Sequence, residues 1–92
     1  MEMQLGPEEE ELVGSGIVGD EVGQRIGRLI NGYLERLASA NGGWDVLFRD
    51  PHDGRLWELT FPLSEMHGGG PRILRHVADS VAREKYKLKA KR

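Results

Sequence analysis

The sequence predicts an α+β fold in which one long amphipathic helix packs on a small antiparallel sheet, formed by a hairpin and a third strand, with a short C-terminal helix. Two observations carry this prediction: a helical repeat of apolar residues over 20–39, and two alternating segments joined by a turn sequence over 44–61. The length of 92 residues suits one domain with a thin core. We expect a flexible acidic segment at 1–11, a single α+β domain over 12–86 and a flexible basic tail at 87–92.

The long helix is predicted from Asp20 to Ser39. Asp20 is a good N-cap residue, and the sequence Asn41-Gly42-Gly43 supplies a stop. Gly23 and Gly27 lie four residues apart, so they either mark a face that a strand or partner approaches closely or reflect sequence drift. The apolar stripe repeats at spacings of three and four, and its members are Val22, Ile26, Leu29, Ile30, Tyr33, Leu34 and Leu37.

The hairpin is predicted from strands at 44–49 and 55–61. Each strand places apolar residues at every second position, which is typical of a sheet with one face in the core. The intervening Asp50-Pro51-His52-Asp53-Gly54 is a strong turn sequence, because proline, aspartate and glycine each favour turn conformations. We expect Trp57 in the core and Trp44 on the surface.

The remaining segments give weaker patterns. Leu12-Val13 and Ile17-Val18, with glycines between them, are compatible with a short irregular strand. Apolar residues over 73–77 fit either a third strand or the start of a terminal helix, and a short helix is expected over about 79–85.

The composition excludes several kinds of function. The chain has no cysteine, which excludes thiol chemistry and favours a reducing, cytoplasmic location. Apolar runs are too short to cross a membrane, and His52, His67 and His76 do not have the spacing of a metal site. No motif of nucleophilic catalysis occurs. We therefore expect no cofactor, no metal and no enzymatic activity.

Charge is distributed unevenly along the chain. Residues 1–82 carry 14 acidic and 7 basic side chains, whereas residues 83–92 carry 1 acidic and 6 basic ones. An acidic body suits a basic protein partner, which it can steer into contact. The basic tail could contact nucleic acid or membrane, although a solvated terminus is the simpler interpretation.

The candidate contact residues follow from these patterns. Acidic side chains gather along the hairpin, Trp44 is a candidate anchor because tryptophan is enriched in binding hot spots, and the glycine run after His67 allows a tight reversal, a partner contact or an anion cradle. The predicted partner-binding residues are Trp44, Asp45, Asp50, Asp53, Glu58, His67, Gly68, Gly69 and Gly70.

The segment from Gly43 to Thr60 resembles the immunity protein 27 family of bacterial polymorphic-toxin immunity proteins. The resemblance extends through the runs at 66–71 and 82–86 and includes the opening at 11–15. It implies a protein that binds a cognate toxin domain made by the same cell and neutralises it by occlusion, without catalysis. We expect a monomer or weak homodimer. The alternative is a small nucleic-acid-associated protein that uses the basic tail.

Overall fold

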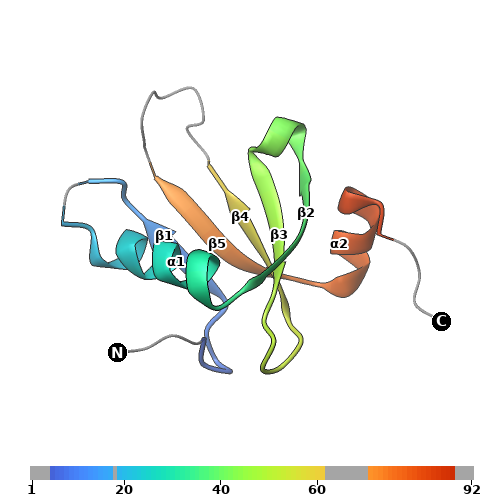
Figure 1. The fold of residues 1–92 in the computed structure, drawn as a ribbon, viewed down its shortest axis with the longest axis horizontal. Helices are drawn as coiled ribbons and strands as arrows, with labels where there is room; N and C mark the ends of the chain where they lie inside the picture. Colours follow the sequence, from blue (N-terminus) through green and yellow to red (C-terminus); the bar gives the residue numbers. More distant parts are fainter. Residues whose placement is uncertain (1–4, 18, 62–70, 89–92) are drawn as a thin grey trace.

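The computed structural model describes residues 5–17, 19–61 and 71–88, which form a five-stranded antiparallel sheet and two α-helices. Figure 1 shows α1 lying across the β1–β5 half of the sheet and α2 beside the β2 half. In chain order the elements are β1 (Glu11–Gly14), α1 (Glu21–Gly32), β2 (Glu35–Ala40), a 3-10 turn η1 (Asn41–Gly43), β3 (Asp45–Arg49), β4 (Leu56–Thr60), β5 (Arg72–Val77) and α2 (Asp79–Tyr86). The α+β class is confirmed, but the sheet is larger than the three strands that we predicted.

The spatial order of the strands is β1-β5-β4-β3-β2, so β4 lies at the centre and β1 and β2 form the two edges. The predicted hairpin is β3–β4, with Phe48 opposite Trp57, and the predicted third strand is β5, with Leu74 opposite Leu59. The short N-terminal strand β1 pairs with β5 and places Leu12 opposite Leu74. The first strand of the chain therefore lies beside the last one.

The long helix is shorter than predicted, because α1 ends at Gly32 and the following six-residue segment from Glu35 is an edge strand. Glycine costs a helix interior about 1 kcal/mol relative to alanine, so Gly32 favours termination there. Pairing of β2 with β3 and packing of Ala38 and Ala40 against the core then stabilise the strand. Tertiary contacts therefore override the helical spacing of Leu34 and Leu37.

The start of α1 agrees with prediction. The side chain of Asp20 caps the helix by accepting a hydrogen bond of 3.0 Å from the backbone N–H of Gly23. A side chain at Gly14 of β1 would place its Cβ 2.9 Å from the Cα of Gly23. The glycine face of the helix is thus a place where a strand approaches closely.

The two helices cover opposite faces of the sheet. Trp57 and Leu59 of β4 pack in one cluster with Ile26 and Leu29 of α1. Their neighbour Leu56 belongs to a second cluster with Ala82 and Tyr86 of α2. Because successive side chains of a strand point to opposite faces, the sheet has one core on each side, where we predicted a single layer of helix.

Residues 5–11 belong to the segment for which we predicted flexibility. Leu5 is 4 % exposed and lies in the cluster under α1, while Glu11 begins β1. At the other end, Leu88 packs against the cluster under α2. The domain boundaries at 12 and 86 remain predictions, but contacts of the core extend past both of them.

Candidate functional site

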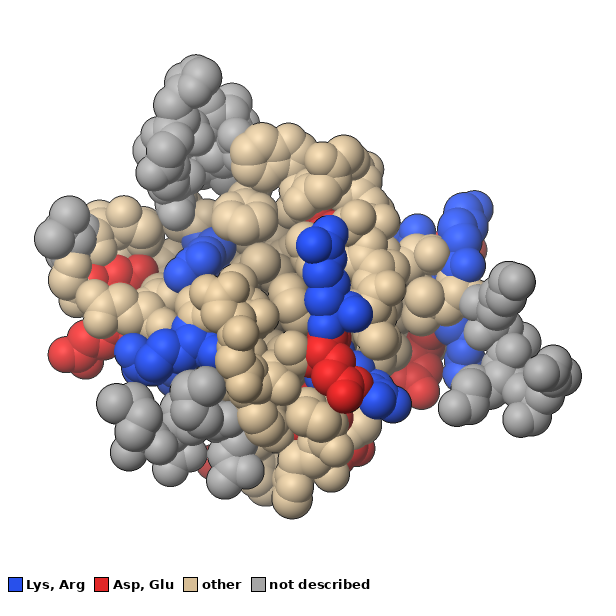
Figure 2. Space-filling view, in the orientation of Figure 1, with Lys and Arg blue, Asp and Glu red and all other residues tan. Residues whose placement is uncertain are grey.

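The acidic residues predicted to form one surface lie in different places. Asp45 and Glu58 are on the α2 side of the sheet, where both contact Lys85. Asp50 and Asp53 are in the β3–β4 loop. On the face in view, Figure 2 shows Asp and Glu side chains dispersed among Lys and Arg rather than gathered in a single acidic patch.

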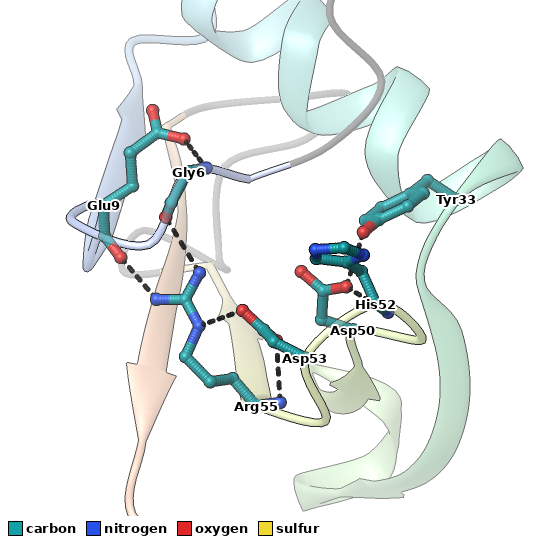
Figure 3. Close-up of polar contacts among 7 residues, drawn as sticks. All are labelled: Gly6, Glu9, Tyr33, Asp50, His52, Asp53 and Arg55. Atoms are coloured by element: carbon teal, nitrogen blue, oxygen red, sulfur yellow. Dashed lines mark hydrogen bonds and ion pairs between the residues drawn. The ribbon is translucent and has the colours of Figure 1, made fainter.

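Asp50 is a buried residue whose hydrogen bonds fix the conformation of the hairpin loop. It is fully buried, and its Oδ1 accepts hydrogen bonds from the Tyr33 hydroxyl at 2.5 Å and from the His52 backbone N–H at 2.8 Å (Figure 3). Its backbone N–H donates to the Arg55 carbonyl, and its carbonyl accepts from Gly54, each at 2.8 Å. Burial, together with the bond to Asp50, raises the pKa of Tyr33 to about 12. These contacts engage Oδ1 with the fold, whereas Oδ2 is buried and has no hydrogen-bond partner among the described residues.

Glu58 anchors the C-terminal helix. Its Oε2 accepts hydrogen bonds from the Tyr86 hydroxyl at 2.7 Å and from Lys85 Nζ at 2.5 Å. Asp45 lies 2.9 Å from the same ammonium group. Burial and the bond to Glu58 raise the pKa of Tyr86. This network therefore fixes α2 on the sheet.

Arg55 joins the hairpin to the N-terminal segment, a role that sequence reasoning missed. Its guanidinium donates to Asp53 at 2.8 Å and to the carbonyls of Gly6 and Glu9 at 2.9 Å each (Figure 3). The same group lies over the Trp57 ring, 5.0 Å from its centroid. Nothing local in the sequence indicates these partners, because the two carbonyls are more than 45 residues away.

The N-terminal segment is held by a second arginine. Arg25 of α1 donates to both carboxylate oxygens of Glu9, at 2.7 and 2.8 Å. These hydrogen bonds lower the pKa of Glu9. The charge of Glu9, within the acidic segment at 1–11, is therefore paired with the body of the domain.

Trp44 and Asp53 are the predicted contact residues that are exposed in the described part of the chain. Trp44 is 50 % exposed, and its ring meets Phe61 edge-on at a centroid distance of 5.7 Å. The assignment of Trp57 to the core and Trp44 to the surface is confirmed. The predicted contacts at 67–70 lie outside the described residues.

Arg36 and Leu37 are exposed neighbours, although we predicted Leu37 in the apolar stripe of the helix and did not name Arg36 as a contact. Both lie on β2, which we assigned to the helix. Leu37 sits where the β2–β3 register shifts, so it is the extra residue of a bulge. An interrupted helical repeat after Gly32 is the signal that could have placed them on a strand.

Within the described ranges, no three His, Asp or Glu side chains converge in a way that could hold a metal ion. Nor does this part of the chain contain a helix long and apolar enough to cross a membrane.

Comparison with known proteins gives one match. The family model of immunity protein 27 matches residues 12–78, which span β1 to β5. No curated protein and no solved structure matches the chain. The resemblance stated from the sequence is thus confirmed, over most of the range expected for it.

Proposed function

We propose that this chain, which belongs to the immunity protein 27 family, binds a cognate toxin domain and neutralises it by occlusion. Family membership is the observation that carries this proposal. Occlusion requires an interface of about 1,000 Å² or more with good complementarity and needs no chemical step. The proposed setting is the bacterial cytoplasm, with the chain acting as a monomer or weak homodimer.

The arrangement of acidic side chains supports binding rather than catalysis. General acid–base work needs a carboxyl group that can reach a substrate. Asp50 is buried against Tyr33, and Glu58 is engaged by Lys85 and Tyr86. Both carboxylates serve the fold in this arrangement.

The predicted contact set divides accordingly. We retain Trp44, Asp53 and the loop at 67–70 as proposed direct contacts. For Asp45, Asp50 and Glu58 we propose an indirect contribution, because their contacts hold the hairpin and α2 in place within the fold.

Co-expression tests the proposed function. The chain is produced together with the C-terminal domain of the large protein encoded beside it, and cell survival and co-purification are scored. We expect survival and a stable complex, whereas a non-cognate immunity protein gives neither. Toxicity without rescue, and no complex at any expression ratio, would contradict the proposal.

A further inference from the structure

An exposed surface lies on the α1 side of the sheet, over the β2–β3 edge, where Trp44 packs on the core-facing Phe61. Register places Arg36 opposite Phe48 and Ser39 opposite Val46, and Phe48 and Val46 both belong to or pack against the cluster under α1. Directly opposed residues of neighbouring strands share a face. We call this the aromatic–arginine surface, and its members are Arg36, Ser39, Trp44, Val46 and Phe61.

This surface combines an exposed aromatic ring with half-buried apolar side chains that support it from below. Trp44 is 50 % exposed. Val46 and Phe61 are half-buried and pack against the core beneath them. The edge-on contact with Phe61 holds the Trp44 ring in place before any partner arrives, so little side-chain freedom is lost on binding.

The charge of the surface is positive. Arg36 is exposed, and no carboxylate lies within ion-pair distance of it in the described part of the chain. By contrast, Arg49 of β3, which lies opposite Glu35, is paired with that carboxylate at 2.5 Å. The one charged member of the aromatic–arginine surface is therefore a guanidinium.

The edge of β2 favours recognition by side chains over strand addition. β2 is the last strand of the sheet, which leaves its outer backbone groups without a strand neighbour. The bulge at Leu37 interrupts a regular ladder, and bulges of this kind discourage further strands from pairing.

We propose that the aromatic–arginine surface is the docking site for the toxin domain, and that the toxin offers an apolar pocket for Trp44 rimmed by Asp or Glu side chains that pair with Arg36. Tryptophan and arginine are the residue types that dominate binding hot spots, and charge complementarity at the rim selects an acidic partner surface. This inference rests on the proposed function and adds to it the surface and the chemistry of the partner. It assigns the electrostatic attraction to an arginine instead of to Asp45, Asp50 and Glu58, whose carboxylates have partners within the fold.

Binding of the purified chain to the purified toxin domain tests this inference by calorimetry at two salt concentrations. The variants are Trp44→Ala, Arg36→Glu and Arg36→Lys. Arg83→Glu is the matched control, because Arg83 is an exposed arginine of α2 on the other side of the sheet. Thermal melting establishes that each variant is folded. We expect folding to be preserved, because Arg36, Trp44 and Arg83 are all exposed.

We expect Trp44→Ala to weaken binding by about 30-fold, a loss typical of truncating a hot-spot residue. Arg36→Glu weakens it by about tenfold or more and flattens its salt dependence, whereas Arg36→Lys and Arg83→Glu stay within about threefold of the wild type. If the wild type binds and both Trp44→Ala and Arg36→Glu bind equally well, the surface is wrong while the immunity role stands. A folded wild-type chain that does not bind the toxin overturns the proposed function and the docking site with it.

Discussion

Asp50 illustrates how one residue can serve a turn and a core together. It has the residue type that turns favour, yet its carboxylate is fully buried and bonded to Tyr33, seventeen positions earlier in the chain. Hydrogen bonds to a charged group contribute about 1.5–3 kcal/mol each when buried. The turn is therefore tied to the end of α1 as well as to its own backbone.

Replacing Asp50 with Ala is expected to lower the free energy of unfolding by about 3 kcal/mol, because Tyr33 and the His52 N–H lose their acceptor. Asp53→Ala is the matched control three residues away. Its ion pair with Arg55 is partly exposed, so the expected cost is about 1 kcal/mol or less. Urea unfolding measures both, and equal losses would refute the special role of Asp50.

The two tryptophans should respond differently to a soluble quencher. Trp44 is half exposed and Trp57 fully buried, so fluorescence of the free chain is expected to contain one accessible and one protected component. Trp44→Phe should remove the accessible component and leave the protected one. A Trp44→Phe protein that is quenched as readily as the wild type would show that Trp57 is not in the core.

At the scale of elements, the hairpin could be predicted and the β2 strand could not. Residues 44–61 carry alternation and turn chemistry that act locally, so their structure follows from nearest neighbours. Residues 35–40 have apolar spacings that suit a helix, and only the open edge of β3 selects the strand. The same error hid Arg36, because a residue assigned to a solvated helix face gives no hint of a sheet surface.

The contact between β1 and α1 requires glycine on the strand. Gly14→Ala is expected to destabilise the fold by about 1–3 kcal/mol, since the new Cβ would lie 2.9 Å from the Gly23 backbone and neither element can yield easily. Gly27→Ala is the control on the same helix.

At Gly27 the new Cβ would lie 3.1 Å from the end of the flexible Arg72 side chain, and alanine also favours the helix by about 1 kcal/mol. We expect stability within about 1 kcal/mol of the wild type. Thermal or urea unfolding compares the two variants, and a larger loss for Gly27→Ala would contradict the close approach of β1.

On the scale of the whole molecule, both tyrosines are tied to buried carboxylates. Burial raises the pKa of Tyr33 to about 12 and also raises that of Tyr86. A raised pKa means that the folded state holds its protons more tightly than the unfolded state, so this contribution to stability is complete below pH 10 and is lost as the pH rises toward and past 12.

Alkaline titration, monitored by the absorbance of phenolate, checks the raised pKa values of the two tyrosines. No phenolate should form in the folded chain around pH 10, the ordinary pKa of tyrosine, and absorbance should rise together with loss of helical circular dichroism. Tyr33→Phe is expected to reduce the loss of stability above pH 10. Ionisation of both tyrosines near pH 10 in a folded chain would contradict the two buried networks.

The overall arrangement of the elements could not be predicted from the sequence, because it depends on contacts between distant segments. The α+β class and the β3–β4 hairpin follow from local patterns. The pairing of β5 and the second core under α2 depend on distant contacts, such as that between Tyr86 and Glu58, 28 residues away. Likewise, Leu5 enters the first core because Arg55 holds the segment beside it. Such long-range contacts have no local signature, which is why the acidic residues were predicted as one surface.

Titration of a fixed amount of active toxin domain with the purified chain tests the central claim of stoichiometric occlusion most directly. The account predicts that toxin activity falls linearly and ends at one equivalent of chain, with a complex that can be isolated from the mixture. Full inactivation by a small fraction of an equivalent would indicate catalysis by the chain. Undiminished activity at a large excess would contradict neutralisation altogether.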